Sequence, residues 1–154
     1  MPDRATIEDF LAQRHVAVVG VSRDSRQFAN GVYRHLRSGG RTLHPVNAAA
    51  AGALLEGDPS YPSLASVPGP VDGVLVLVPA SAALAVVQDA VDRGVGRVWL
   101  HRGAGSGAVS DEAVQACHDA GVRVVDGACP LMFADPVRGI HHLHRVLSGR
   151  RIAA

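Results

Sequence analysis

The residues best suited to bind an anion follow an apolar run near the start of the chain. That run is Val16–Val19, and Gly20-Val21-Ser22-Arg23 follows it, with Arg26 shortly after. A glycine turn that opens into a helix presents backbone N–H groups to an anion. Arginine can pair with phosphate oxygens through two parallel hydrogen bonds. The pattern therefore predicts a phosphate site at this turn, and the alternative is an ordinary strand-to-helix turn with solvated arginines.

Two features of a dinucleotide site are missing around the turn. The second and third glycines of the dinucleotide fingerprint are absent, and no acid ends the next strand, about 20 residues further on, to hold a ribose hydroxyl. That strand ends in Pro45-Val46-Asn47, and the nearest acid is Glu56. These absences weigh against NAD(P). Asn47 instead offers its amide to a ribose, a base or a neighbouring loop, or it serves as a turn residue.

Two later turns carry further candidate contacts. Val78-Pro79-Ala80 ends an apolar run, where proline stops the strand and exposes an apolar ledge for an adenine, or simply ends the strand before a helix. Leu100-His101-Arg102-Gly103 follows another run. His101 could act in proton transfer, but no partner lies near it in the sequence, and a lone histidine is more often structural or solvated.

The thiols and the remaining histidines have both reactive and structural interpretations. Cys129, followed by Pro130, comes after the last apolar run and would be reactive if an arginine or a helix N-terminus lowered the pKa of its thiol. A small buried hydrophobic role is the alternative. Cys117 lies on an apolar helix face and is expected in the core. His141, His142 and His144 resemble a metal tract, but no cysteine or carboxylate pair completes a zinc set nearby, so we expect a solvated helix face.

These turns must be positioned by alternating strands and helices. The apolar runs predict strands. A leading helix is expected over 6–13 with Thr6 as N-cap, and the helices expected between strands are one carrying Phe28, Val32 and Leu36 and two capped at Ser81 and Ser110. Strand starts recur about every 25–30 residues, as in βαβ units. The expected strands are Val16–Val19, Thr42–Val46, Val71–Val78, Arg97–Leu100 and Val122–Val125.

The resulting fold class is α/β: a three-layer, doubly wound parallel sheet of about five strands, with its ligand at the carboxyl ends of the strands. Residues 47–70 are rich in Ala, Gly, Pro and Ser and are expected to hold only a short strand or helical turn. We expect a single domain over 1–154, with a core of about 15–133 and a C-terminal helical segment over 137–150. An apolar face on that segment could support a homodimer.

Composition narrows the class of protein. The 154 residues are 47% hydrophobic with a formal net charge of +1, which gives no broad basic field for nucleic acid. No apolar run reaches the length of a membrane span and the start of the chain has no signal-peptide character. Two cysteines do not form a disulfide framework. We expect a cytoplasmic protein with no nucleic acid or membrane partner.

Four separated motifs together resemble the stand-alone CoA-binding domain family, which is similar to the CoA-binding domain of the succinyl-CoA synthetase alpha subunit. The resemblance runs from about His15 to Phe133. The motifs are Val18-Val19-Gly20-Val21-Ser22-Arg23, Pro45-Val46-Asn47, Val98-Trp99-Leu100-His101-Arg102-Gly103 and Ala128-Cys129-Pro130-Leu131-Met132-Phe133. The family often has proline where this chain has Ala48, and glutamine where it has His101.

The resemblance implies a Rossmann-like fold that binds coenzyme A. By motif position, Gly20 to Arg23 would meet the CoA phosphates, and Asn47 would lie beside the nucleotide. Val78, Pro79 and Ala80 would border the adenine or pantetheine, and Leu100, His101, Arg102 and Gly103 would line the pantetheine side. Cys129 and Pro130 would close the far edge.

The leading hypothesis is a non-catalytic module for CoA or acyl-CoA that acts as a sensor, a carrier or a subunit of a larger assembly. A chain of this length has no room for the synthetase's phosphohistidine-bearing domain, so ligase activity is not implied. The alternatives are an acyl-CoA-dependent enzyme or CoA-thiol-reactive protein that uses Cys129 or His101, and an NAD(P)-binding redox sensor.

Overall fold

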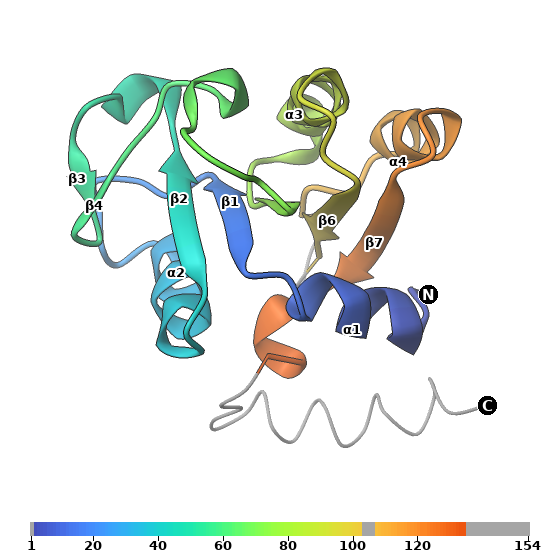
Figure 1. The fold of residues 1–154 in the computed structure, drawn as a ribbon, viewed down its shortest axis with the longest axis horizontal. Coiled ribbons are helices and arrows are strands. Elements are labelled where there is room, and N and C mark those ends of the chain that lie inside the picture. The colour runs from blue at the N-terminus through green and yellow to red at the C-terminus, as the bar shows by residue number, and fades with distance from the viewer. Residues whose placement is uncertain (1, 103–106, 135–154) are drawn as a thin grey trace.

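Five parallel strands form the centre of the protein. The computed structural model describes residues 2–102 and 107–134. The strand order is β2-β1-β5-β6-β7, and every neighbouring pair is parallel. This is the expected three-layer Rossmann-like architecture (Figure 1). The strands are β1 (His15–Val19), β2 (Thr42–Val46), β5 (Gly73–Val76), β6 (Arg97–His101) and β7 (Arg123–Ala128).

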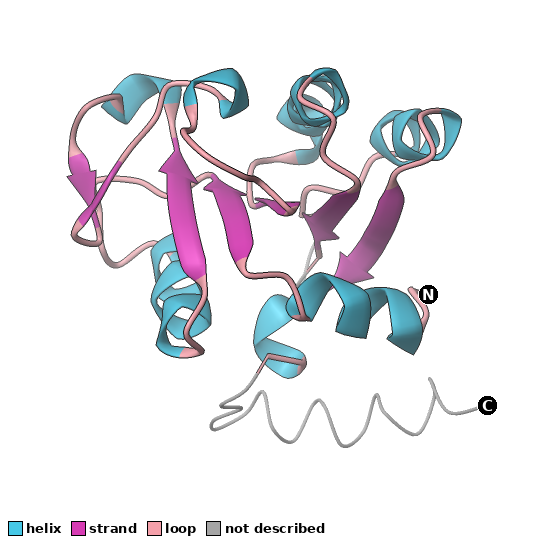
Figure 2. Ribbon diagram, viewed as in Figure 1, coloured by secondary structure: helices cyan, strands magenta, loops and turns pink. Residues whose placement is uncertain are grey.

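Helices cover both faces of the sheet (Figure 2). One face packs against α1 and α2, and the other against α3 and α4. Parallel strands are expected to be joined by right-handed crossovers, and the chain runs from β1 toward β2 on one side but adds β6 and β7 on the other. The connecting helix α2 therefore lies on one face and the connecting helices α3 and α4 lie on the other. The helices are α1 (Arg4–Leu11), α2 (Phe28–Ser38), α3 (Ala80–Asp92) and α4 (Asp111–Asp119).

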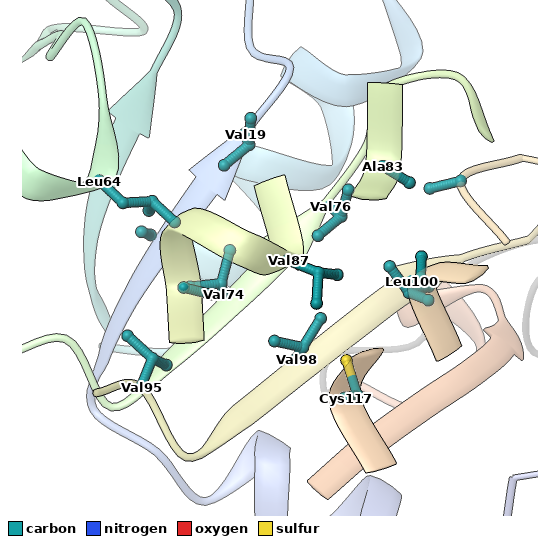
Figure 3. Close-up of a cluster of buried hydrophobic side chains, with 14 of the residues drawn as sticks. Val19, Leu64, Val74, Val76, Ala83, Val87, Val95, Val98, Leu100 and Cys117 are labelled. Atoms are coloured by element: carbon teal, nitrogen blue, oxygen red, sulfur yellow. The ribbon is translucent and has the colours of Figure 1, made fainter. Parts of the chain in front are cut away.

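Alternation along the strands sends side chains into two separate cores. On β6, Val98 and Leu100 face α3 and α4, whereas Trp99 packs with α1 and α2. Figure 3 shows the core between the sheet and helices α3 and α4, with Val87 of α3 above Val98. All four side chains are fully buried. A sheet buried on both faces needs near-continuous apolar strands, which is why the strands are rich in valine.

Two of the three predicted helix caps were wrong. Asp3, not Thr6, caps α1: its carboxylate accepts from the Thr6 N–H at 2.9 Å, so the helix begins at Arg4. Helix α3 begins at Ala80, which places Ser81 inside the helix, and Pro79 occupies the N-cap position without a side-chain bond. Ser110 is confirmed as the cap of α4, because its hydroxyl accepts from the Ala113 N–H at 3.1 Å.

Strands β1 and β6 are each one residue longer than expected, and β5 and β7 differ from expectation by more. Strand β5 covers only the centre of the expected Val71–Val78, although the flanking Leu77 N–H still donates to Val19 O at 2.8 Å. Strand β7 continues past Val125 to Ala128. A register shift allows this extension, since Leu100 pairs with Asp126 and His101 with Ala128. The skipped residue, Gly127, has φ +97°.

Residues 47–70 contain more structure than expected. The antiparallel strands β3 (Leu54–Leu55) and β4 (Asp58–Pro59) form a hairpin beside the β2 edge of the sheet. A 3-10 turn lies on each side of it, η1 (Ala48–Ala50) and η2 (Leu64–Ser66). A last 3-10 turn, η3 (Pro130–Met132), follows β7. Gly103, the histidines at 141, 142 and 144, and the expected helix over 137–150 lie outside the described residues.

The amino ends of the strands are closed by an ionic cluster. Asp9 of α1 accepts from Arg97 Nε at 2.7 Å and lies 3.2 Å from Arg123 Nη1, which joins α1 to the starts of β6 and β7. The hydrogen bond from Arg97, aided by Arg123, lowers the pKa of the Asp9 carboxyl. Within the described residues, no helix is both long and apolar enough to cross a membrane.

Candidate functional site

The strand order reverses between β1 and β5, and the carboxyl ends of these two strands mark the place in the sheet. From β1 the chain continues to β2 on one side, whereas β5, β6 and β7 extend the sheet on the other. In open α/β sheets, ligands bind where the strand order reverses in this way. The turn after β1, which begins at Gly20, and the Leu77–Pro79 segment after β5 therefore border the expected site.

Gly20 allows these two segments to approach closely. Its φ is +119°, and a Cβ at this position would lie 2.9 Å from Leu77 O. Its N–H donates to Val46 O at 3.3 Å, which holds the turn to the end of β2. Both the backbone conformation and the space therefore require glycine.

The turn after Gly20 is held by a buried side chain that the sequence analysis missed. Asn30, on the first turn of α2, is 1% exposed. Its Oδ1 accepts from the Ser22 N–H at 3.0 Å, and its Nδ2 donates to Ser22 O at 2.8 Å. The Ser22 hydroxyl contacts the main chain of Asp24. The polar atoms of Ser22 are thus engaged within the protein, and they shape the turn.

The arginines expected near phosphate are exposed, but two have protein partners. Arg23 Nη1 donates to Ala49 O at 2.9 Å, which links the turn to η1. Arg26 pairs with Asp24 within its own turn, at 3.0 Å between Nε and Oδ1, and its side chain is 89% exposed. Arg102 is exposed at the end of β6. Exposed ion pairs contribute little to stability, so the Arg26 guanidinium can exchange Asp24 for another anion at small cost.

Asn47 connects two loops. Its Nδ2 donates to Val21 O at 2.9 Å, and its Oδ1 accepts from the Ala49 N–H at 2.9 Å. Of the alternatives for Asn47, this geometry favours contact with a neighbouring loop, because both ends of the amide are engaged.

The predicted apolar contacts separate into buried and accessible groups. Val21 and Leu100 are fully buried, and Pro130 is also buried. Only the main chain of Val21 or Leu100 could meet a ligand. Pro79 is exposed, whereas Val78 and Ala80 are half-buried. Phe28, expected on the packed face of α2, is instead 48% exposed.

His101 is the least satisfied polar side chain at this end of the sheet. Its ring packs against Phe28, with ring centroids 4.9 Å apart. Its Nε2 is buried and has no hydrogen-bond partner within residues 2–102 and 107–134. Burial lowers the pKa of His101, which favours the neutral imidazole. One ring nitrogen therefore remains available for a hydrogen bond.

Both thiols are buried. Cys129 is 4% exposed, and burial raises the pKa of its thiol despite opposing backbone hydrogen bonds from Leu131 and Met132. Cys117 lies in the core, as expected, and burial raises its pKa to about 11. A thiol with a raised pKa forms little of the nucleophilic thiolate near neutral pH.

The three-dimensional arrangement thus brings the turns after β1, β2 and β5 together, and it places His101 against the start of α2. Sequence reasoning missed Asn30 and the role of Glu56, whose Oε1 accepts from Asn30 Nδ2 at 2.8 Å. The position of Asn30 could have indicated its role, because it is a polar residue on the first turn of the helix that follows the Gly20 turn.

Comparisons with known proteins agree with this geometry. The chain is 26% identical over 132 residues to the alpha subunit of acetate–CoA ligase (ADP-forming) II from Pyrococcus furiosus, a match that covers 80% of this chain and 28% of the relative. The chain therefore spans little more than a quarter of that protein's length.

Solved structures show the same fold. A hypothetical protein from Pyrococcus horikoshii has a TM-score of 0.74 at 26% identity, covering 82% of this chain and 85% of that one. A dinucleotide-forming acetyl-coenzyme A synthetase 1 from Candidatus Korarchaeum cryptofilum, in complex with phosphate and ADP, has a TM-score of 0.67 at 28% identity. That match covers 79% of this chain and 27% of the synthetase chain. Residues 14–135 match the CoA binding domain family across most of the chain, and the protein belongs to that family.

Proposed function

We propose that this protein binds coenzyme A or an acyl-CoA as a non-catalytic module. The observation that carries the proposal is the position of the Gly20 turn: in a chain of the CoA binding domain family, it lies where the strand order reverses. An anionic ligand is favoured there by the exposed side chains of Arg23 and Arg26, and Arg102 is exposed after β6 at the same end of the sheet.

The proposed ligand would extend from the Gly20 turn toward β6 and β7. Its phosphates would lie against the turn from Gly20 to Arg23, whose path Ser22 maintains, and would pair with Arg23 and Arg26. Asn47 would support the turn beside the nucleotide. Its adenine or pantetheine would border Val78–Ala80. The pantetheine arm would continue past His101, Arg102 and Gly103 toward Cys129 and Pro130.

An enzymatic role for Cys129 or His101 has weaker support. The Cys129 thiol is buried with a raised pKa, and no hydrogen-bond partner aligns His101 Nε2 for proton transfer within the described structure. An NAD(P) role is also disfavoured, because Glu56 is already bonded to Asn30 and Arg34 and is not free to hold a ribose.

The relatives suggest how such a module would be used. One is named as a ligase subunit and another as an acetyl-coenzyme A synthetase. We propose that this chain works as a sensor, a carrier or a subunit of a larger assembly, or as a homodimer. Native mass spectrometry would report a retained ligand and the assembly state together.

Calorimetric titration with CoA and, separately, with NADH tests the binding proposal. CoA should bind and should raise the melting temperature with increasing concentration, whereas NADH should do neither. Arg23→Ala should weaken CoA binding about tenfold through loss of one charge-assisted contact. Arg4→Ala is the matched control, since Arg4 pairs with the exposed Glu8 on α1. Absence of heat and of a thermal shift at millimolar CoA would overturn the proposal.

A further inference from the structure

The β3–β4 hairpin contacts the Gly20 turn through a short chain of hydrogen bonds. Asn30 Nδ2 has two hydrogens: one goes to Ser22 O at 2.8 Å, and the other to Glu56 Oε1 at 2.8 Å. Asn30 Oδ1 meanwhile accepts from the Ser22 N–H. All three partners require the same orientation of the amide. Asn30 thereby bonds both the N–H and the carbonyl of Ser22, and Glu56 fixes the orientation of the Asn30 amide.

Glu56 occupies a backbone position that its own side chain does not favour. It is the only non-glycine with positive φ in residues 2–102 and 107–134, at +52°. Gly57 follows at +86°, so the pair forms the tight turn between β3 and β4. Such turns favour asparagine or aspartate before glycine. Glutamate is longer than the residues that this turn favours, and its backbone is strained. We therefore expect that Glu56 is present for the interactions of its carboxylate and not for the turn conformation.

The carboxylate is fixed by more than Asn30. Arg34 Nη1 donates to Glu56 Oε1 at 2.8 Å, and the Glu56 side chain is only 10% exposed. One helical turn further along α2, Arg37 donates to the Glu56 carbonyl and to Asp58 Oδ2. Residues 30, 34 and 37 share one face of α2. The hairpin therefore docks along this face as a unit, with Glu56 at the end nearest the Gly20 turn.

We propose that Glu56 and Asn30 are positioning residues for ligand binding, and that the β3–β4 hairpin sets the affinity of the Gly20 turn without touching the ligand. This inference rests on the proposed function. Because coupling between two sites is reciprocal, ligand at the turn must also stabilise the hairpin. A purely structural hairpin would show no such response.

Two substitutions separate positioning from stability. Glu56→Asn creates the Asn-Gly pair that suits the turn, but its side chain is too short to reach Asn30. Glu56→Gln keeps both the reach and an acceptor oxygen. We expect Glu56→Asn to bind CoA about three- to tenfold more weakly, the usual effect of one lost hydrogen bond, and Glu56→Gln to bind within about twofold of wild type. Asp9→Asn, which removes a carboxylate with two arginine neighbours at the opposite end of the sheet, should bind CoA normally.

Hydrogen exchange, compared between the wild-type protein and Glu56→Asn, supplies a second measurement. CoA should slow amide exchange in residues 52–60, and this slowing should be lost in Glu56→Asn. Wild-type CoA affinity in Glu56→Asn, or no slowing in these amides when CoA is bound, would overturn the inference and leave the proposed function intact. If the wild-type protein does not bind CoA, the proposed function fails and this inference fails with it.

Discussion

The two ends of the sheet are stabilised by different kinds of polar interaction. At the amino ends, Asp9 lies between Arg97 and Arg123, so one carboxylate joins α1 to the starts of two strands through ion pairs. At the carboxyl ends, Asn30 and Asn47 bond mainly to backbone atoms of turns. The first arrangement closes the fold, whereas the second shapes loops and leaves cationic side chains toward solvent.

This contrast shows where function is placed in the fold. Hydrogen bonds from a neutral side chain to the backbone fix the path of a loop and leave the charged side chains of that loop available for a ligand. This arrangement suits a binding site built from turns. His101 Nε2, which lacks a partner in the described part of the chain, also lies at the carboxyl end. Changes at the amino ends should therefore affect stability alone, whereas changes at the carboxyl ends should also alter ligand binding.

The largest effect is expected from Gly20→Ala. The added Cβ would meet the Leu77 carbonyl oxygen at 2.9 Å on a backbone with φ +119°. We expect the free energy of unfolding to fall by about 2–3 kcal/mol and CoA binding to be lost. Urea unfolding and calorimetric titration measure the two effects.

Gly40→Ala is the matched control for this substitution. Gly40 also has positive φ, at +82°, but no described atom would lie within 4 Å of a Cβ added there. The substitution should cost about 1 kcal/mol from backbone strain alone and leave CoA binding unchanged. Equal losses in both variants would show that the close approach at Leu77 is unimportant.

Asp9→Asn should affect stability alone. We expect a loss of about 1–2 kcal/mol, because two arginines lose their charged partner. The folded-state pKa of Asp9 lies below its ordinary value of 3.8, so its stabilisation is present above that pH and is lost as the pH falls through the lower, folded value. The variant should therefore show a shallower loss of stability in acid, measured by urea unfolding from about pH 6 to about pH 2. A weakened CoA affinity would contradict the separation of the two ends.

Cys129 should react slowly despite its place at the binding end. In a Cys117→Ser background, we expect a disulfide reagent at about pH 8 to modify native Cys129 at least about tenfold more slowly than the urea-unfolded chain, because burial restricts access and raises the thiol pKa. The absorbance of the thiol that the reagent releases measures the rate of the reaction. Equal native and unfolded rates would favour the thiol-reactive alternative.

The smallest effect is expected from His101→Phe. Replacing a buried nitrogen that has no partner among the described residues with carbon removes a desolvation cost while keeping an aromatic contact with Phe28. The melting temperature of the ligand-free protein should rise by about 1–3 °C. His35→Phe is the control and should lower it, since His35 Nε2 contacts Ala134 O at 3.2 Å. A fall in both variants would show that His101 is stabilising as it stands.

Local patterns predicted the strands and most helices, but not every end. Thr42–Val46 agrees fully with β2, and Ser110 caps α4 as expected. The Thr6 prediction failed because the Asp3 carboxylate caps α1 three residues earlier. The Ser81 prediction failed because α3 already begins at Ala80, directly after Pro79, which makes no side-chain cap bond. The extension of β7 through Gly127 depends on pairing with β6, which no local pattern reveals.

A valine-rich α/β sheet and the glycine turn at Gly20 could be predicted from the sequence, because periodicity and backbone freedom are local properties. The pairing of β5 with β1, the link from Ser22 through Asn30 to Glu56, and the packing of His101 against Phe28 are visible only in the folded protein. These features join residues that are distant in the chain. Their energies depend on packing and hydrogen bonds that exist only after the strands have assembled.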